Sequence, residues 1–298
     1  MSEFIDNNKI VEQLEKKLKG KEAELDELYG VLNRLNSYVA NLIQDAEAGV
    51  RAAITLHRKL ATRKLPKLSD VNFSSKYIIS NTELSSYYEF FELPDASGGG
   101  VLVCDSKGYG ISALMMSVVI SLLETAAAKS PRTFVETLRA DIKEHIKKDE
   151  GKTLNTNGKT ASIFYMVFER GEMNLRYCSV GMPGFLVVRG NEVTHLGENN
   201  ADIINVQDAE EKNIKLTPGD RIIIPNRGIT FSQNAFGDKF GIERLKNCLM
   251  NSSHIPIADV VSNIGYELDN FTQNQRSRLC GDMVVVGMEL ARKMLYVV

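Results

Sequence analysis

The residues best placed to do chemistry lie where an apolar run gives way to a glycine-rich turn, in Val103-Cys-Asp-Ser-Lys-Gly-Tyr-Gly110. Asp105 ends the apolar run, and a carboxylate at such a turn is well placed to hold a divalent metal ion. Gly108 and Gly110 also match part of a dinucleotide-binding pattern, because a predicted helix follows them. That match is weak, since Pro131 starts a second helix where a nucleotide-binding unit needs a second parallel strand.

The elements that must position Asp105 are short β-type runs interrupted by helices. Runs rich in β-branched and aromatic residues predict strands at 76–80, 100–104, 161–168, 175–179, 185–188, 221–224 and 283–286. Helices are predicted at about 111–129, 131–148 and 258–273. Strands in runs, with paired helices between them, indicate a layered α+β domain and not a regular βαβ alternation.

The N-terminal segment has a different pattern, a heptad repeat of apolar residues separated by Glu and Lys. One register holds Val11, Leu18, Leu25, Leu32, Val39 and Ala46, and the second holds Leu14, Leu28, Leu35 and Leu42, with Lys21 as its exception. This pattern is typical of a coiled coil, and pairing with a second copy of the chain is the simplest interpretation. The alternative is an amphipathic helix folded back on the domain, because Gly20 and Gly30 weaken a long helix.

The segment around Pro66 ends this helical pattern, so we predict a helical segment at residues 1–64 and a globular domain at residues 65–298. Hydrophobic residues make up 43% and charged residues 25% of the 298, as in ordinary globular proteins. A net charge of −2 argues against nucleic acid as a partner. The sequence has no stretch of about 20 apolar residues and begins with polar, acidic residues, so we expect no membrane span and a cytoplasmic location.

Further motifs around the Asp105 turn occur in an order that is characteristic of one family. They are Tyr88-Glu-Phe-Phe-Glu-Leu-Pro-Asp95, Val180-Gly-Met-Pro183, Leu216-Thr-Pro-Gly-Asp220, Phe240-Gly-Ile-Glu-Arg-Leu245 and Gly281-Asp-Met-Val284. The chain resembles, over about residues 52–290, the SpoIIE/RsbU group of PPM (protein phosphatase 2C-like) serine/threonine phosphatases. The resemblance implies two antiparallel sheets stacked face to face and flanked by helices, with the upstream helix as a signal-receiving linker.

Phosphatases of this family use two divalent cations, Mn²⁺ or Mg²⁺, bridged by carboxylates, and one metal-bound water is the nucleophile. The resemblance places the bridging aspartate at Asp105 and the adjacent backbone ligand at the carbonyl of Ser106. An earlier aspartate of the family falls on Ser86, and a third falls on Arg227. In the last motif the first acidic position is Gly281 and the second is Asp282. The family ligand is usually the first of the two, and a register shift of one residue leaves Asp282 as a candidate ligand.

Two or three of the four ligand carboxylates are therefore missing, and Arg227 introduces a cation that repels a dication by several kcal/mol at close range. We infer that a normal two-metal centre does not assemble, that no cofactor is needed and that no residue can be given a catalytic role. A sharper hypothesis is that Arg227 occupies the vacated metal space and pairs with Asp105, and in one version also with Asp282. The alternative is that Arg227 points to solvent.

The leading functional hypothesis is a catalytically degenerate SpoIIE-like domain that acts by binding and forms a homodimer through its N-terminal helix. The resemblance implies a protein partner in a partner-switching pathway, such as a STAS-type anti-anti-sigma factor or its phosphorylated form. A second hypothesis is an active Mn²⁺- or Mg²⁺-dependent phosphoserine/phosphothreonine phosphatase that uses Asp105, Asp282 and Glu89 in an altered site. The third is a purely structural coiled-coil protein.

Overall fold

The computed structural model describes residues 14–41, 44, 68, 70–80, 84–93, 97–107, 115, 118–148, 161–203, 206, 208–250, 252 and 254–291. Contacts between residues divide the chain into two units, Met1–Thr55 and Leu56–Val298. The predicted boundary between residues 64 and 65 lies outside the described residues and stays a prediction.

The first unit contains the predicted N-terminal helix, which is continuous over residues 14–41 and runs through both glycines. Its heptad leucines are exposed: Leu18 by 61%, Leu28 by 60% and Leu35 by 56%. The helix is therefore confirmed, whereas the coiled coil stays a prediction. None of the helices in the described residues has both the length and the apolar composition needed to cross a membrane.

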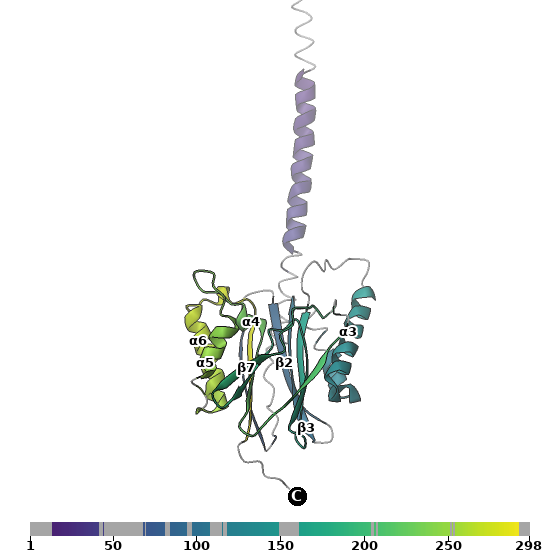
Figure 1. Cartoon of the computed structure of the whole chain (residues 1–298). Coiled ribbons are helices and arrows are strands. Elements are labelled where there is room, and N and C mark those ends of the chain that lie inside the picture. Colours follow the sequence, from purple (N-terminus) through teal and green to yellow (C-terminus); the bar gives the residue numbers. More distant parts are fainter. Residues whose placement is uncertain are drawn as a thin grey trace, which may run out of the picture. The chain divides into compact units, whose positions relative to one another are not determined.

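The second unit contains two antiparallel sheets, each with five strands among the described residues (Figure 1). The first sheet has the order β1 (Val71–Ile78), β10 (Met283–Leu290), β9 (Arg221–Pro225), β6 (Phe185–Arg189), β7 (Glu192–Leu196). The second sheet has the order β2 (Leu84–Glu92), β3 (Gly98–Lys107), β4 (Ala161–Glu169), β5 (Asn174–Val180), β8 (Glu211–Lys215). The predicted α+β sandwich is confirmed, and every predicted strand lies within or overlaps an observed one.

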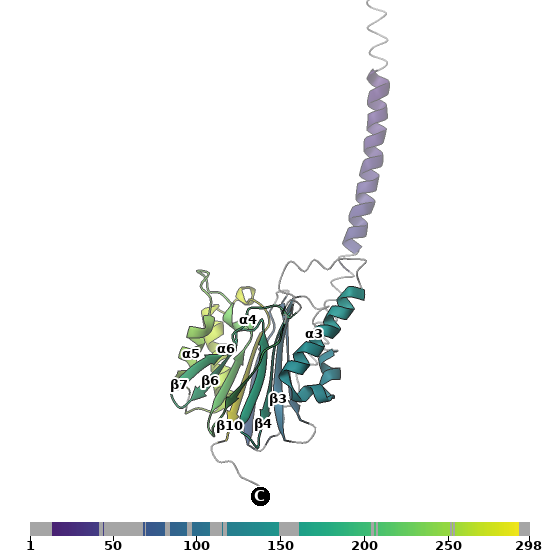
Figure 2. The same ribbon diagram turned by 45° about the vertical axis from the view of Figure 1, so that its right-hand side comes forward.

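Helices cover the outer faces of both sheets (Figures 1 and 2). The described helices are a segment at residues 118–123, α3 (Pro131–Lys148), α4 (Arg227–Thr230), α5 (Gly241–Met250) and α6 (Ile257–Phe271), with 3₁₀ turns η1 (Ala126–Lys129) and η2 (Arg276–Arg278). Packing α3 on the second sheet, and α5 and α6 on the first, buries one apolar cluster under each helical layer. A third cluster fills the space between the sheets. The central strands β3, β4 and β10 are thus buried on both faces, which explains their continuous apolar runs.

The described elements that were not predicted from the sequence are β2, β7, β8, α4, α5 and η2. Strand β2 carries Ser85, Ser86 and Glu89, polar residues that interrupt an apolar pattern but are buried in the fold. Strands β7 and β8 lie at sheet edges, where few side chains are fully buried. A strand signal based on apolar runs is weak at such positions.

Candidate functional site

Asp105 lies near the end of β3 and faces the space between the two sheets. In β3 it follows Val101 and Val103, which belong to the cluster between the sheets, and alternate residues of a strand point to the same face. Ser86 of β2 lies directly across from Asp105 on one side, and Ser162 of β4 lies across on the other. The carboxylate is therefore enclosed by neighbouring strands and is almost completely buried.

Both carboxylate oxygens of Asp105 accept hydrogen bonds from protein groups. Oδ1 accepts from Ser86 Oγ at 2.7 Å and from Asn226 Nδ2 at 2.9 Å, and Oδ2 accepts from the backbone N–H of Arg227 at 3.0 Å. Burial raises the pKa of Asp105. These hydrogen bonds and the positive charge of Arg227 lower the pKa, but by less than burial raises it. The carboxylate is thus held by three donors in a site with little access to water.

Asn226 is the residue that the sequence analysis missed, and it is the centre of this cluster. It follows β9, caps α4 and is completely buried. Besides Asp105, its Nδ2 contacts Ser86 Oγ at 2.8 Å and the carbonyl oxygen of Asp282 at 2.7 Å. Its Oδ1 accepts from the backbone N–H of Val284 at 3.0 Å. An asparagine after a strand usually indicates a turn, so no sequence signal shows that this amide points inward.

Asp282 is also buried, but its carboxylate binds a different set of donors from those around Asp105. It accepts from Tyr77 Oη at 2.6 Å and from the backbone N–H of Ser80 at 2.8 Å, with the N–H of Ser86 at 3.5 Å. Its backbone carbonyl is the part that faces Asn226 and the Ser86 hydroxyl, at 2.7 and 3.1 Å. We refer to Ser86, Asp105, Asn226 and Asp282 as the Asp105 cluster.

Gly228 allows the backbone to approach closely at this cluster. A Cβ atom on Gly228 would lie 2.1 Å from the carbonyl oxygen of Asp282, and 3.1 Å from that of Gly281. Any larger residue at position 228 would therefore push α4 away from β10, and the contact between Asn226 and Asp282 would be lost. The glycine-rich turn after Asp105, residues 108–110, lies outside the described residues.

Two other predicted residues do not join the Asp105 cluster with their side chains. Ser106 follows Asp105 and so points to the opposite face of β3, where its hydroxyl lies 3.3 Å from that of Ser85. Glu89 lies three residues after Ser86 in β2, so its side chain points to the opposite face of the sheet. There its carboxylate accepts a hydrogen bond from the hydroxyl of Tyr87. The proposal that Glu89 contributes to an altered metal site with Asp105 is wrong, because a sheet separates the two carboxylates.

Arg227 contacts Asp105 through its backbone and not through its guanidinium. Its side chain instead extends over Phe231, with Cζ 5.4 Å from the centroid of the ring. In the described part of the chain, the guanidinium forms no ion pair with Asp105 or Asp282, so the predicted side-chain pairing is wrong. The physical reason is that the amide of Asn226 already occupies the space beside Asp105.

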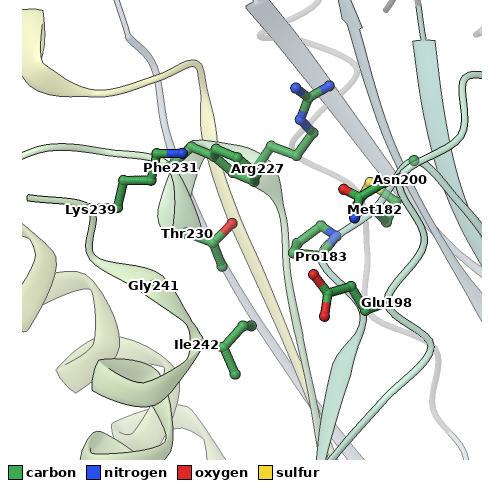
Figure 3. A pocket seen from close by; sticks show the side chains of 11 residues that line it. Met182, Pro183, Glu198, Asn200, Arg227, Thr230, Phe231, Lys239, Gly241 and Ile242 are labelled. Atoms are coloured by element: carbon green, nitrogen blue, oxygen red, sulfur yellow. The ribbon is translucent and has the colours of Figure 1, made fainter.

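The side chain of Arg227 lines an open pocket of about 220 Å³ next to the Asp105 cluster (Figure 3). Phe231 and Lys239 lie on the same side of the pocket, and the Nζ atom of Lys239 is 4.7 Å from the centroid of the Phe231 ring. Met182, Pro183 and Glu198 line the other side. We call this cavity the Arg227 pocket.

Asp105 and Asp282 are the two acidic side chains of the Asp105 cluster. Among the described residues, no group of three or more His, Cys, Asp or Glu side chains is arranged to hold a metal ion. Ser86 and Asn226 contact both Asp105 and the backbone carbonyl of Asp282.

A sandwich of two antiparallel sheets with helices outside, and an aspartate at the end of β3, defines the PP2C class of phosphatase folds. The family model described as Stage II sporulation protein E (SpoIIE) matches residues 96–290. The chain therefore belongs to the SpoIIE family. A search among curated proteins found no match.

Solved structures with the same fold come from bacterial signalling proteins. The SiaA-PP2C domain of Pseudomonas aeruginosa has a TM-score of 0.62 and 14% identity, and the match covers 86% of this chain and 98% of that one. The structure of the RsbU and RsbW domains of Rv1364c from Mycobacterium tuberculosis has a TM-score of 0.61 and 15% identity. That match covers 78% of this chain and 65% of that one. For the PP2C domain and a regulatory fragment of SpoIIE from Bacillus subtilis the values are 0.59 and 16%, covering 75% of this chain and 64% of that one.

Identities this low show the shared fold and nothing finer. Two further structures with this fold contain metal, since RsbX was solved with magnesium and the catalytic domain of PstP with two manganese ions.

Proposed function

We propose that this chain is a catalytically degenerate member of the SpoIIE family that regulates signalling by binding a protein partner. The main observation in support is that both carboxylate oxygens of Asp105 accept hydrogen bonds from protein groups. In a two-metal phosphatase those oxygens would bind the cations. Here a metal ion would have to displace Asn226 and Ser86 from a buried site, which leaves their polar groups without partners.

The residues around Asp105 do not fit a dinuclear metal centre for two further reasons. Ser86, Arg227 and Gly281 stand where the family resemblance expects carboxylates, so the site has too little negative charge for two dications. Asp282, the remaining candidate ligand, directs its carboxylate to Tyr77 and Ser80. We therefore infer that neither Mn²⁺ nor Mg²⁺ is a cofactor of this protein.

The proposed partner is a component of a partner-switching pathway, such as a STAS-type anti-anti-sigma factor. One structure with this fold joins an RsbU domain to an RsbW domain, which supports a role beside other regulatory proteins. We further propose that the protein acts in the cytoplasm.

We also propose that the N-terminal helix pairs with a second copy, because its heptad leucines are exposed in a single chain. Leu25→Lys with Leu32→Lys in the full chain should convert a dimer to a monomer in light scattering. Glu27→Lys, which changes the outer face of the helix, should leave the mass unchanged. If the doubly substituted chain keeps the mass of the wild type, the helix is not the dimer interface.

The decisive experiment measures phosphate release from a phosphoserine peptide in millimolar Mn²⁺. The wild type should release no more phosphate than the Asp105→Asn variant, which retains the size of the side chain. Activity in the wild type that vanishes in Asp105→Asn would overturn the proposal and establish a working phosphatase with an altered metal site.

A further inference from the structure

We propose that the N-terminal helix carries a second apolar seam, through which two dimers of this chain associate as a tetramer. The second seam consists of Leu28, Val31, Leu35 and Tyr38. This inference rests on the proposed function, because it takes the proposed dimer as its building unit. It assigns a binding partner, a second dimer, to a face of the helix that the dimer seam covers only in part.

Two lines of residues run along the helix at residues 14–41, and they share one set of side chains. The heptad positions are labelled a to g, with Leu18 at a and Leu14 at d. The dimer seam consists of positions a and d. Positions d and g are also separated by three and four residues in turn, so they form a second line on an adjacent face. From Leu28 onward this line is apolar throughout.

In the first half of the helix the same line of d and g positions is polar. Lys17, Lys21 and Glu24 follow Leu14 along it, and Nζ of Lys21 donates to the carboxylate of Glu24 within the helix. Burying these charges between helices would remove them from water at a large cost in free energy. The second seam therefore begins at Leu28, and the first half of the helix supports only the dimer seam.

The g positions of the second seam are exposed in the single helix, Val31 by 48% and Tyr38 by 61%. In a two-stranded coiled coil, the a and d side chains are covered, whereas e and g lie at the edge of the seam and are often charged. An aliphatic and an aromatic residue at g therefore extend the apolar stripe beyond what one partner helix covers. A stripe of a, d and g is typical of a helix that contacts two neighbours in a bundle.

A second dimer of this chain is the partner that fits this seam. The e and g positions after Leu28 carry no charge, since they hold Tyr29, Val31, Asn36 and Tyr38. Charges at these positions are what select a different helix as partner, whereas two copies of one apolar surface can pair with each other. Each dimer also presents the second seam twice, so two dimers engage through two seams at once.

The second seam is shorter than the dimer seam. It extends over residues 28–38, whereas the dimer seam runs along the whole helix at residues 14–41. Less apolar area is buried between dimers than within one, so dimers should associate more weakly than single chains do. The mass in solution should therefore rise from two chains to four as the protein concentration rises.

The test is sedimentation equilibrium of the full chain from micromolar to near-millimolar protein. The mass of the wild type should rise from two chains to four. Val31→Lys with Tyr38→Lys should remain at two chains throughout, because lysine at g is compatible with a dimer and favours a helix. Val31→Leu with Tyr38→Phe keeps the seam apolar and should restore the rise. The matched charge control, Ala23→Lys with Ser37→Lys, adds the same charges on the opposite face and should also show the rise.

A wild-type mass of two chains at every concentration would overturn this inference and leave the proposed dimer intact. A rise that persists in Val31→Lys with Tyr38→Lys, or that is also lost in the charge control, would overturn the assignment of the contact to the second seam. A wild-type mass of one chain would instead contradict the proposed dimer. Phosphate release in Mn²⁺ tests the degenerate site separately, because it does not depend on these masses.

Discussion

The Asp105 cluster and the Arg227 pocket are neighbours in the chain with opposite chemistry. In the cluster, Asp105 and Asn226 are buried and each is bound by several protein groups. In the pocket, Arg227 and Lys239 contact the aromatic ring of Phe231. Successive residues, Asn226 and Arg227, contribute one side chain to each region. The comparison teaches that a side chain can be buried in a hydrogen-bonded cluster at one position while the side chain of the next residue lines an open pocket.

The largest expected effect is on the free energy of unfolding when Asn226 is replaced by Ala. The change leaves Asp105 without one donor and the N–H of Val284 without its acceptor, in a site closed to water. We expect a loss of about 3–5 kcal/mol in urea unfolding. The matched control is Asn200→Ala, an exposed asparagine of the Arg227 pocket, with no expected change. A loss below about 1 kcal/mol would mean that the cluster does not stabilise the fold.

The second prediction restores the acidic positions that the family resemblance expects, by Ser86→Asp, Arg227→Asp and Gly281→Asp in one chain. Mn²⁺ at a hundred times its dissociation constant should stabilise this variant by about 2.7 kcal/mol in thermal unfolding. The wild type should show no change with Mn²⁺ or with EDTA. Adding Asp105→Asn to the variant should abolish the effect. If Mn²⁺ stabilises the wild type as strongly, the cluster is open to metal.

The third prediction concerns the separate donors of Asp282. Tyr77→Phe removes a hydrogen bond of 2.6 Å to a buried carboxylate and should cost about 2 kcal/mol in urea unfolding. Tyr266→Phe is the control, because that tyrosine is exposed by 63% and its variant should match the wild type. Equal stabilities of the two variants would show that the hydroxyl of Tyr77 does not hold Asp282 in place.

The smallest expected effect is on how stability depends on pH. Burial raises the folded-state pKa of Asp105 above the ordinary 3.8, so the folded chain binds this proton more tightly than the unfolded chain. Its contribution is complete below pH 3.8 and is lost as the pH rises through the raised value. The difference in unfolding free energy between wild type and Asp105→Asn should therefore decrease from pH 4 upward, as followed by urea unfolding. A difference that does not vary with pH would contradict the raised pKa.

The contribution of Asp220 to stability should depend on pH in the opposite direction from that of Asp105, because its pKa is lowered and not raised. Its burial favours a raised pKa, but hydrogen bonds from Arg189 and Thr217 outweigh that effect and lower it below 3.8. Its contribution to stability is therefore present above pH 3.8 and is lost as the pH falls through the lowered value. An Asp220→Asn variant should consequently differ from the wild type equally across pH 5 to 7.

The sequence predicted the elements whose residues have one dominant pattern. Strands β4 and β10 are continuous apolar runs, and α3 begins at Pro131 as the proline signal predicts. Strand β2 was missed, because its buried Ser86 finds its polar partner, Asp105, only when β2 pairs with β3. A local pattern cannot distinguish a buried polar residue with a partner from an exposed one.

The sequence by itself determined the class of the protein: the family motifs, the substituted acidic positions and the helix at residues 14–41 can all be read from residue types and spacing. Only the tertiary structure decided which group binds Asp105. Asn226 lies 121 residues from Asp105 in the chain. It reaches the carboxylate because it follows β9, which pairs with β10 in the sheet that faces β3. Hydrogen bonds over such separations depend on how the two sheets pack, and that packing directs Asn226 inward and Arg227 to the pocket.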